Sequence, residues 1–276
     1  MIQKKWQLNV LHIVLPLIAF IFIFPIVMVY YNGFKSYGEI VVDALALPET
    51  WTLENFAVAW KTMNFPRLFL NTLFVTVFGV AGIVLLSAPA AYKMQRETSS
   101  YSKGLRMLFL LPMLIPVQTI MITLTNVLTK LGLMNSLPGL VLAYWGLGIP
   151  MASFLYMGGV AAVPYEVEES AMIDGCGPFR LFGQVVFPLL KPISGTVIIL
   201  DVMWLWNDFL LPLLTVNGTR DGKTLQLGAY TFFGQYVTQW NFAIAGIIMA
   251  VTPTILFFIL MQKYIVKGII AGAVKG

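Results

Sequence analysis

The side chains of this sequence that could do chemistry are gathered in one acidic stretch, VPYEVEESAMIDGCGPFRLFGQVVFPLLKP, residues 163–192. Up to residue 180 the stretch has a single basic residue, Arg180. Its carboxylates are Glu166, Glu168, Glu169 and Asp174. A row of carboxylates can pair with basic residues on the surface of another protein. The pattern therefore indicates recognition of a basic partner.

The sequence shows no catalytic machinery. It has no G-x-x-x-x-G-K-[ST] loop for the phosphates of ATP and no nucleophile elbow. Its single histidine, His12, and single cysteine, Cys176, form neither a metal-binding set nor an intrachain disulfide. A membrane enzyme would need a cluster of catalytic groups near one membrane interface. We therefore predict that the chain is not an enzyme and that a partner supplies the energy for its work.

The acidic stretch has the pattern of a helix, a tight turn and a second helix. Gly175 is a natural stop for a helix that begins after Pro164, and Pro178 fits the first position of the next one. The first helix carries an apolar stripe of Val167, Ala171 and Met172. Two interpretations are open: a solvated loop that keeps away from anionic lipid, or a helix that docks into a groove on a partner. The apolar stripe favours docking.

The composition places these helices in a membrane protein. Of the 276 residues, 59% are hydrophobic and only 11% are charged, and the mean hydropathy is +0.84. Soluble domains have roughly 25% charged residues. A soluble fold of this length could not bury so much apolar surface, so we predict an integral membrane protein with helical spans. The net charge of +5 then reflects orientation in the membrane, and no nucleic-acid partner is expected.

Six largely charge-free runs are predicted to span the membrane, because about 20 helical residues cross a bilayer. The predicted spans are residues 10–31, 68–92, 107–129, 138–160, 193–215 and 242–262. The first run follows Lys4 and Lys5 as a signal peptide would. It is too long and lacks a cleavage site, so an uncleaved span is the better interpretation.

Six spans place both ends of the chain on one side of the membrane. Of the 17 Lys and Arg residues, eleven fall in the segments on that side and six in the opposite segments. Basic residues concentrate in cytoplasmic loops. Both termini and residues 163–192 are therefore predicted to be cytoplasmic. On the opposite side lies a long segment, residues 32–66, in which TLENFAVAW predicts a short amphipathic helix at the membrane surface.

Polar side chains within the spans mark a candidate solute path. Ionisable groups in spans are costly and often functional. The fifth span contains Asp201 and Asp208, next to tryptophan and asparagine residues that suit a sugar. Each aspartate could instead pair with a neighbouring subunit and have a purely structural role. The candidate path residues are Gln118, Asn126, Asp201, Trp204, Asn207 and Asp208.

The stretch VEESAMIDGCGPFRLFGQVVFPLLKP resembles the EAA loop of the permease subunits of ATP-binding-cassette (ABC) importers. The pattern of that loop is roughly E-E-A-A-x-x-D-G-A, a spacer and F-x-x-I-x-L-P. The matching residues are Glu168, Glu169, Ala171, Asp174, Gly175, Phe182 and Pro188. Ser170, Cys176 and Phe187 depart from the pattern by small or apolar exchanges, which leave the docking interpretation intact.

Other segments extend the resemblance over nearly the whole chain. NTLFVTVFGVAGIVLLSAPAAYKMQR is similar to the second span of carbohydrate permeases of the maltose-transporter kind. LWNDFLLPL is similar to their fifth-span W-N-[DE]-F-L-x-P-L segment, and QKYIVKGIIAGAVKG to their closing tail. The chain thus resembles the inner-membrane permease subunits of binding-protein-dependent ABC importers, of the carbohydrate-uptake, MalG-like type.

This resemblance implies an all-α integral membrane protein with the type I importer permease fold. One permease domain, residues 1–276, would have six transmembrane helices, and residues 163–192 would form a cytoplasmic coupling helix–turn–helix before the fifth span. In this family the loop sits in a cleft of an ATPase subunit. The residues implied in coupling are Glu166, Glu168, Glu169, Ala171, Asp174, Gly175 and Phe182. Glu169 is the first candidate to pair with a basic ATPase residue.

The implied function is half of the translocation path for a sugar or oligosaccharide, in a multi-pass protein of the bacterial inner membrane. The implied partners are a second permease, expected to be a MalF-like heterologue, two ATP-binding subunits that hold ATP and Mg, and an extracytoplasmic solute-binding protein. No cofactor is expected in this chain. The tail, residues 268–276, would reach the ATPase interface or be disordered.

Two other functions stay open. The chain could serve an ABC importer of a non-sugar solute, because the EAA loop alone does not set the substrate. A channel or secondary transporter that works without an ATPase is a second alternative. Such transporters usually have repeated halves or chains of intramembrane charges, which the sequence does not show.

Overall fold

The computed structural model describes the backbone of residues 2–219, 221–234 and 238–273, and side chains from residue 12 to residue 262 with the exception of residue 13 and the two gaps. Within these ranges the chain is helical, and the only strand pairing is an isolated bridge between Phe233 and Thr238. The chain divides into two compact units: residues 1–66 with 228–252, and residues 67–227 with 253–276. The final tail residues, 274–276, lie outside the described residues.

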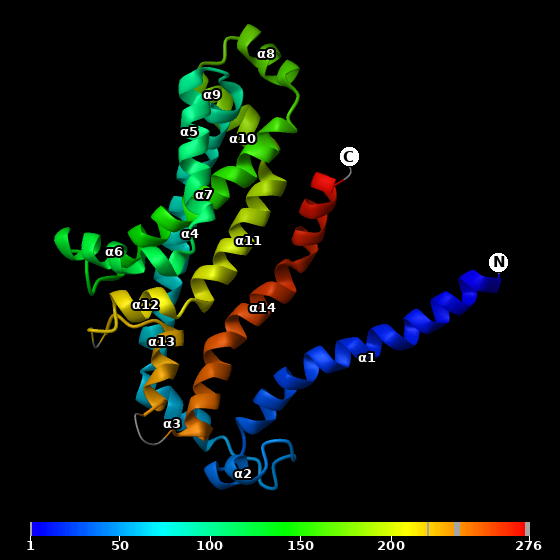
Figure 1. Cartoon of the computed structure of the whole chain (residues 1–276), viewed down its shortest axis with the longest axis vertical. Helices are drawn as coiled ribbons and strands as arrows, with labels where there is room; N and C mark the ends of the chain where they lie inside the picture. The colour runs from blue at the N-terminus through cyan, green and yellow to red at the C-terminus, as the bar shows by residue number, and fades with distance from the viewer. Residues whose placement is uncertain (1, 220, 235–237, 274–276) are drawn as a thin grey trace. The chain divides into compact units, whose positions relative to one another are not determined.

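Figure 1 shows the order of the helices. Those of the first unit are α1 (Ile2–Asn32), α2 (Tyr37–Val42), α3 (Glu54–Met63) and a short turn η3 (Tyr230–Phe232). The second unit contains α5 (Ser100–Leu110), η1 (Leu111–Leu114), α6 (Val117–Lys130), α7 (Leu137–Ala161), α8 (Tyr165–Ile173), α9 (Pro178–Arg180), the π-helical η2 (Leu181–Val186), α10 (Phe187–Leu189), α11 (Lys191–Asn207) and α12 (Leu210–Thr215). Three helices pass from one unit to the other: α4 (Phe65–Arg96), α13 (Leu225–Ala229) and α14 (Trp240–Ala273).

The first unit folds the segment after α1 around buried polar groups. Lys35 is only 1% exposed, and its ammonium donates to the carbonyl oxygen of Asp43 at 2.9 Å and lies over the ring of Tyr31. The amide of Asn55, on α3, donates to the carbonyl oxygens of Gly33 and Lys35 at 2.9 and 2.7 Å. These bonds replace the water that the polar groups lose on burial. The short helix expected from TLENFAVAW is α3.

A capping box begins α2 in the same segment. The Ser36 side chain accepts from the backbone N–H of Glu39, and the Glu39 carboxylate accepts from the backbone N–H of Ser36 at 2.8 Å. The Glu39 carboxylate also accepts from the backbone N–H of Glu49 at 2.8 Å. Bonds to the charged form stabilise it. Ser36 and Glu49 together thus lower the pKa of Glu39 to about 2.

Among the described residues, four helices are long and apolar enough to cross a membrane, and up to six spans result if two bent helix pairs each count as one. The four helical segments are Val14–Asn32, Phe65–Arg96, Leu137–Ala161 and Trp240–Gln262. The first bent pair joins Ser100–Leu114 to Val117–Lys130 at 107°, and the second joins Pro178–Leu189 to Lys191–Asn207 at 75°. The run 107–129, expected as one span, is therefore sharply bent, and the run 193–215 is interrupted after Asn207.

Proline accounts for both interruptions. Ile115 precedes Pro116 and is extended, with φ −97° and ψ 122°, because a following proline disfavours the helical conformation. Asp208 is extended as well, with φ −69° and ψ 133°, where α11 ends. Pro212 lies four residues later, and a proline has no N–H for the carbonyl four residues before it. Each break thus lies where a helical hydrogen bond could not form.

Small residues bring the long helices of the second unit together. A Cβ atom on Gly82 of α4 would overlap the indole of Trp145 on α7, and one on Gly148 of α7 would overlap the side chain of Ile83. The Trp145 indole N–H donates to the carbonyl oxygen of Phe78 at 3.0 Å, which fixes the ring in this position. In membranes, helices associate through such close backbone approach. The interface of α4 and α7 therefore depends on glycine at these positions.

We predict that Gly82→Ala destabilises the protein by about 1–3 kcal/mol, the usual cost of overpacking a tight interface. Its methyl group would displace the Trp145 ring and break the bond to Phe78. Gly146→Ala is the matched control on α7, because nothing lies within 4 Å of its Cβ position. Thermal unfolding of the two variants in detergent measures the difference, and equal unfolding temperatures would contradict the assigned contact.

Candidate functional site

The acidic stretch forms α8, a tight turn and the helical segments α9, η2 and α10. The turn has the hydrogen bonds of a Schellman motif: the N–H of Cys176 donates to the carbonyl of Ala171 at 3.0 Å, and that of Gly175 to the carbonyl of Met172 at 3.0 Å. Gly175 is left-handed, with φ +82°. The sequence dictates this geometry, because glycine adopts left-handed angles without strain.

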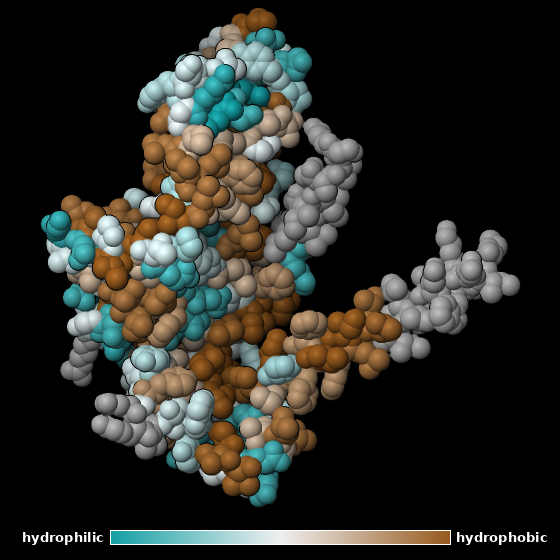
Figure 2. Space-filling view, viewed as in Figure 1, coloured by the Kyte–Doolittle hydropathy of each residue, from teal (hydrophilic) through white to brown (hydrophobic). Residues whose placement is uncertain are grey.

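The surface of this element combines carboxylates with apolar side chains. Glu166, Glu169 and Asp174 are exposed. Ile173 is 86% exposed and Phe179 is 96% exposed, on either side of the turn. Figure 2 shows hydrophilic side chains at the end where α8 lies, with hydrophobic ones at its outermost edge. Large apolar groups left uncovered among charges are typical of a surface that meets another protein.

Glu168 differs from the other acids of α8, because it is buried. Its carboxylate accepts from the Tyr92 hydroxyl and from Arg96 Nε, both at 2.8 Å, and forms an ion pair with Arg96 Nη2 at 2.5 Å. The basic partner of Glu168 is therefore Arg96 of α4 and not Arg180, the single basic residue of the acidic stretch up to residue 180. Arg180 instead donates to Gln184 at 3.0 Å. The sequence could not reveal this contact, since Arg96 precedes Glu168 by 72 residues.

The remaining predicted coupling residues lie in the inner part of the element. Ala171 is half-buried. Phe182 is half-buried as well, and its ring centroid lies 5.3 Å from that of Tyr92 and 5.9 Å from that of Phe187. The second helical segment therefore packs against the end of α4 through an aromatic cluster. This cluster is one of the contacts between the second helical segment and α4.

A second ion pair, which unlike the first is exposed, lies close to this cluster at the end of α4. Lys93 and Glu97 are one helical turn apart, with 2.9 Å between the ammonium nitrogen and the carboxylate oxygen. The Lys93 hydrogen bond, with that of Ser99, lowers the pKa of Glu97 below its usual value. Their side chains are 77% and 36% exposed, and water screens such surface pairs strongly. This pair therefore contributes little to holding α8.

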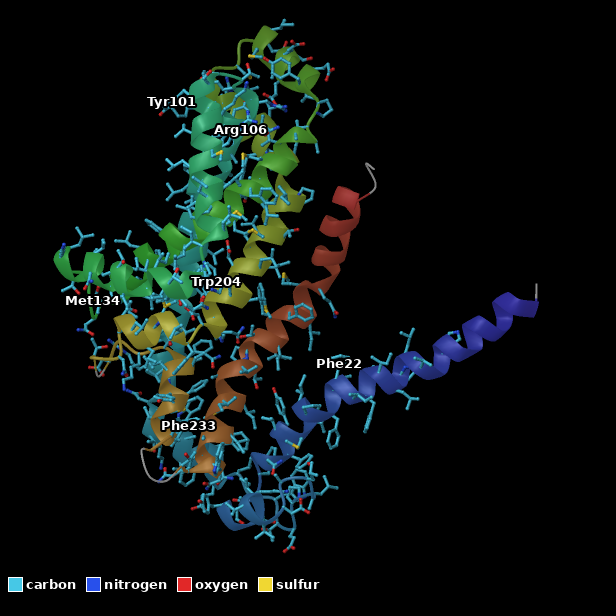
Figure 3. The ribbon with its side chains drawn as sticks, in the orientation of Figure 1. Phe22, Tyr101, Arg106, Met134, Trp204 and Phe233 are labelled. Carbon is cyan, nitrogen blue, oxygen red and sulfur yellow. The ribbon has the colours of Figure 1, made fainter. Side chains whose placement is uncertain are left out.

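The break after α11 gathers part of the predicted solute path. Asp208 accepts from the Tyr144 hydroxyl at 2.8 Å and from the backbone N–H of Leu210 at 3.1 Å. Trp204, labelled in Figure 3, stacks edge-on against the ring of Tyr144 with centroids 5.5 Å apart. Asp208 therefore does not need a neighbouring subunit as its partner. Tyr144 belongs to this site and was missed, because an aromatic residue on an apolar helix gives no distinguishing signal.

Asn207 is exposed next to this break. Its side-chain oxygen accepts from Gln226 at 3.4 Å and from Thr254 at 3.5 Å. Gln118 and Asn126 are exposed on α6, and Asp201 is buried on α11, only 8% exposed. The structure thus brings Trp204, Asn207 and Asp208 to one place, the end of α11. A polar edge beside an aromatic face is an arrangement that can bind a hydroxylated solute.

The helices and these two sites define a multi-pass helical membrane protein with one folded loop that presents acids and apolar groups. Residues 83–271, more than two thirds of the chain, match the family described as "Binding-protein-dependent transport system inner membrane component". The chain belongs to this family. It is therefore a membrane subunit of a transport system and not an enzyme.

Curated relatives cover almost the full chain. "Probable starch degradation products transport system permease protein AmyC" of Thermoanaerobacterium thermosulfurigenes is 39% identical, over 99% of this chain and 97% of that protein. "Multiple sugar-binding transport system permease protein MsmG" of Streptococcus mutans is 31% identical, over 99% of this chain and 100% of that protein. Both are named as permeases, in agreement with the predicted class.

A solved structure has the same fold. It is a chain of a bacterial ABC transporter involved in the import of the acidic polysaccharide alginate. The TM-score is 0.82 at 19% identity, and the match covers 95% of this chain and 97% of that chain. The fold of this protein is therefore that of an ABC importer permease.

We predict that Gly175→Ala loosens the turn after α8, because a left-handed angle costs a residue with a side chain about 1–2 kcal/mol. Nothing lies within 4 Å of the Cβ position, so the cost is confined to the backbone. Hydrogen–deuterium exchange at the Cys176 amide, which is bonded to Ala171, should accelerate about tenfold. Gly175→Asn is the control, since asparagine tolerates this conformation. Unchanged exchange in the alanine variant would contradict the prediction.

Proposed function

We propose that the chain is one permease subunit of an ATP-driven importer for a sugar or oligosaccharide, with α8 as the seat of a cytoplasmic ATPase subunit. A single observation carries the ATPase assignment: exposed acids and the uncovered Ile173 and Phe179 flank a rigid glycine turn on an otherwise membrane-type chain. Such a surface is unstable in water without a partner. A basic, grooved protein surface is its complement.

The proposal includes an orientation and a set of partners. Six spans, counting each bent pair as one, place both termini and α8 in the cytoplasm of a bacterial cell. The complex contains a second permease, two ATPase subunits that hold ATP and Mg, and a solute-binding protein outside the membrane. ATP drives the permease pair between inward-facing and outward-facing states only if it binds the ATPase dimer more tightly in one of them. The ATPase dimer transmits this difference in ATP affinity to the permease through its contact with the exposed face of α8.

The assignment of a carbohydrate as the solute has two supports. Relatives that align over nearly the whole chain are named for starch degradation products and for multiple sugars. At the break after α11, Tyr144 contacts the indole of Trp204 with its ring and donates its hydroxyl to the Asp208 carboxylate, and the neighbouring Asn207 is exposed. A sugar has apolar ring faces and polar hydroxyl edges, and such mixed surfaces bind it. Inorganic ions have no apolar face of this kind.

We predict that Glu169→Lys releases the ATPase subunits and abolishes ATP-dependent uptake, while the permease still inserts in the membrane. A reversed charge opposite a basic groove costs several kcal/mol. Glu54→Lys is the matched control, because Glu54 is an exposed acid on α3, in the other unit. Co-purification of the ATPase from solubilised membranes measures the result. Retention of the ATPase by the Glu169 variant would refute the coupling surface.

The solute class is tested by purifying the intact complex with its binding protein and identifying the bound molecule by mass spectrometry. We expect an oligosaccharide. Trp204→Ala should then lower uptake of that molecule about tenfold, the effect of losing roughly 1.4 kcal/mol of binding. Trp240→Ala, an exposed tryptophan of the first unit, is the control. An amino acid or an ion on the binding protein would replace the carbohydrate assignment.

A further inference from the structure

We propose that Arg96, Tyr92 and Glu168 form a polar clamp that fixes α8 to the end of α4, so that α8 and α5 move as one body when an ATPase partner displaces α8. This inference rests on the proposed function, because the displacement of α8 is attributed to an ATPase subunit. The clamp itself rests on contacts within the second unit. It assigns Glu168 a positioning role, distinct from that of the partner-facing Glu169.

The clamp satisfies every group that it buries. Glu168 accepts at one oxygen from Tyr92 and at the other from Arg96. Arg96 also donates from Nη2 to the carbonyl oxygen of Val163, in the link between α7 and α8, at 2.8 Å. The face of the guanidinium lies 5.7 Å from the ring centroid of Tyr165, the first residue of α8. One side chain of α4 thus holds the start, the middle and the preceding link of α8.

Burial makes this contact strong. The Glu168 side chain is 1% exposed and that of Arg96 is 20% exposed. A buried charge that loses its partner is far less stable than an exposed one, so the pair separates only at high cost. The exposed carboxylates of α8 have no such constraint and remain available to a partner. The two kinds of acid on one short helix therefore have different roles.

The end of α4 is in turn fixed to α5. Arg106, labelled in Figure 3, donates from Nε to the carbonyl oxygen of Met94 at 2.6 Å and from Nη2 to that of Glu97 at 3.0 Å. The Ser102 hydroxyl donates to the same Met94 carbonyl at 3.0 Å. These bonds satisfy carbonyls that the end of a helix leaves without partners. A continuous chain of charged and hydrogen-bonded contacts thus runs from α8 through α4 to α5.

A cavity shows that packing alone does not join these parts. About 470 Å³ of space lies beside the clamp, lined by Lys93 of α4, by Glu97 just after it, and by Met172, Cys176 and Leu181 of the loop. Apolar contact between the turn and α4 is therefore incomplete there. The polar clamp closes one side of this space. Without the clamp, α8 could shift toward or away from α4. A displacement applied to α8 by a partner would then not be passed on to α4 and α5.

Distance measurements between two spin labels test the clamp. Cys176, the only cysteine of the chain, labels the turn after α8, and Tyr101→Cys labels α5 at a position that is 74% exposed. The partner subunits are used in cysteine-free form. We expect the distance between these labels to stay the same without nucleotide and with Mg–ATP trapped by vanadate. A nucleotide-dependent change of about 2 Å or more in the unaltered clamp would overturn the proposal.

Glu168→Gln keeps the size of the side chain and removes its charge. We expect this variant to retain the ATPase subunits and to broaden or shift the label distance by about 2 Å or more, with or without nucleotide. The matched control replaces the exposed pair one turn away, as Lys93→Ala with Glu97→Gln, and should leave the distance unchanged. A Glu168→Gln complex with the unaltered distance distribution would refute the clamp.

Two further variants keep the test decisive if Glu168→Gln does not fold. Tyr92→Phe removes a single oxygen and should broaden the distance distribution less than Glu168→Gln does. Arg96→Gln combined with Glu168→Gln leaves no unpaired charge, so it should narrow the distribution relative to either single variant. If Glu168→Gln fails to assemble, an unaltered distribution in Tyr92→Phe refutes the clamp.

The outcome also separates this inference from the proposed function. If α8 does not seat an ATPase, Glu169→Lys retains the ATPase and nucleotide has no effect on any variant. The clamp variants still broaden the distribution of distances between the two labels in the absence of nucleotide. If only the clamp is wrong, Glu169→Lys releases the ATPase and Glu168→Gln behaves as the unaltered chain.

Discussion

Every backbone N–H and carbonyl of a membrane-embedded chain must find its partner within the protein, because hydrocarbon offers none. The long helices α4, α7 and α14 meet this requirement along most of their length, although Pro89, Pro150 and Pro253 each leave one carbonyl without its usual helical donor. Two other prolines coincide with a break in the helical path: Pro116, which follows the extended Ile115, and Pro212, four residues after the extended Asp208. Trp204, Asn207 and Asp208, which belong to the proposed solute path, lie at the second of these breaks. Fold and candidate path therefore depend on the same constraint.

The buried charged side chains of this protein have partners within the chain, whereas most of the acids of the α8 loop are exposed. Glu168 is tolerated in a buried position because Arg96 and Tyr92 saturate its oxygens. Lys35, buried in the other unit, has a backbone carbonyl and an aromatic face in place of a carboxylate. Glu166 and Glu169 of α8 remain exposed, and no ion pair joins either of them to a basic residue among the side chains that the structure describes. The proposed contact with a basic partner and the internal contact with Arg96 thus use the same residue type at neighbouring positions.

Apolar runs and the position of glycine and proline were enough to predict a helical membrane protein and the turn after α8. The family could be predicted from VEESAMIDGCGPF and the fifth-span motif, since their spacing is specific. The sequence could not show which face of α8 is buried, because the partner of Glu168 lies in a distant helix. Pro112 and Pro116 indicated a bent helix within residues 107–129, but the sequence did not give the size of the bend, about a right angle. Mean hydropathy averages the apolar character of the residues in a run and does not register the hydrogen bonds that prolines remove.

The π-helical segment Leu181–Val186 holds one residue more per turn of hydrogen bonding than an α-helix would. Such a widened turn sets the rotation of the helix before it relative to the helix after it. Removal of one residue would return the segment to ordinary α-helical winding, in which each N–H bonds four residues back in place of five, and would leave the turns on either side nearly in place. The wide turn therefore accommodates one additional residue between the uncovered Phe179 and Pro188, and Phe182, which belongs to this turn, still packs against Tyr92.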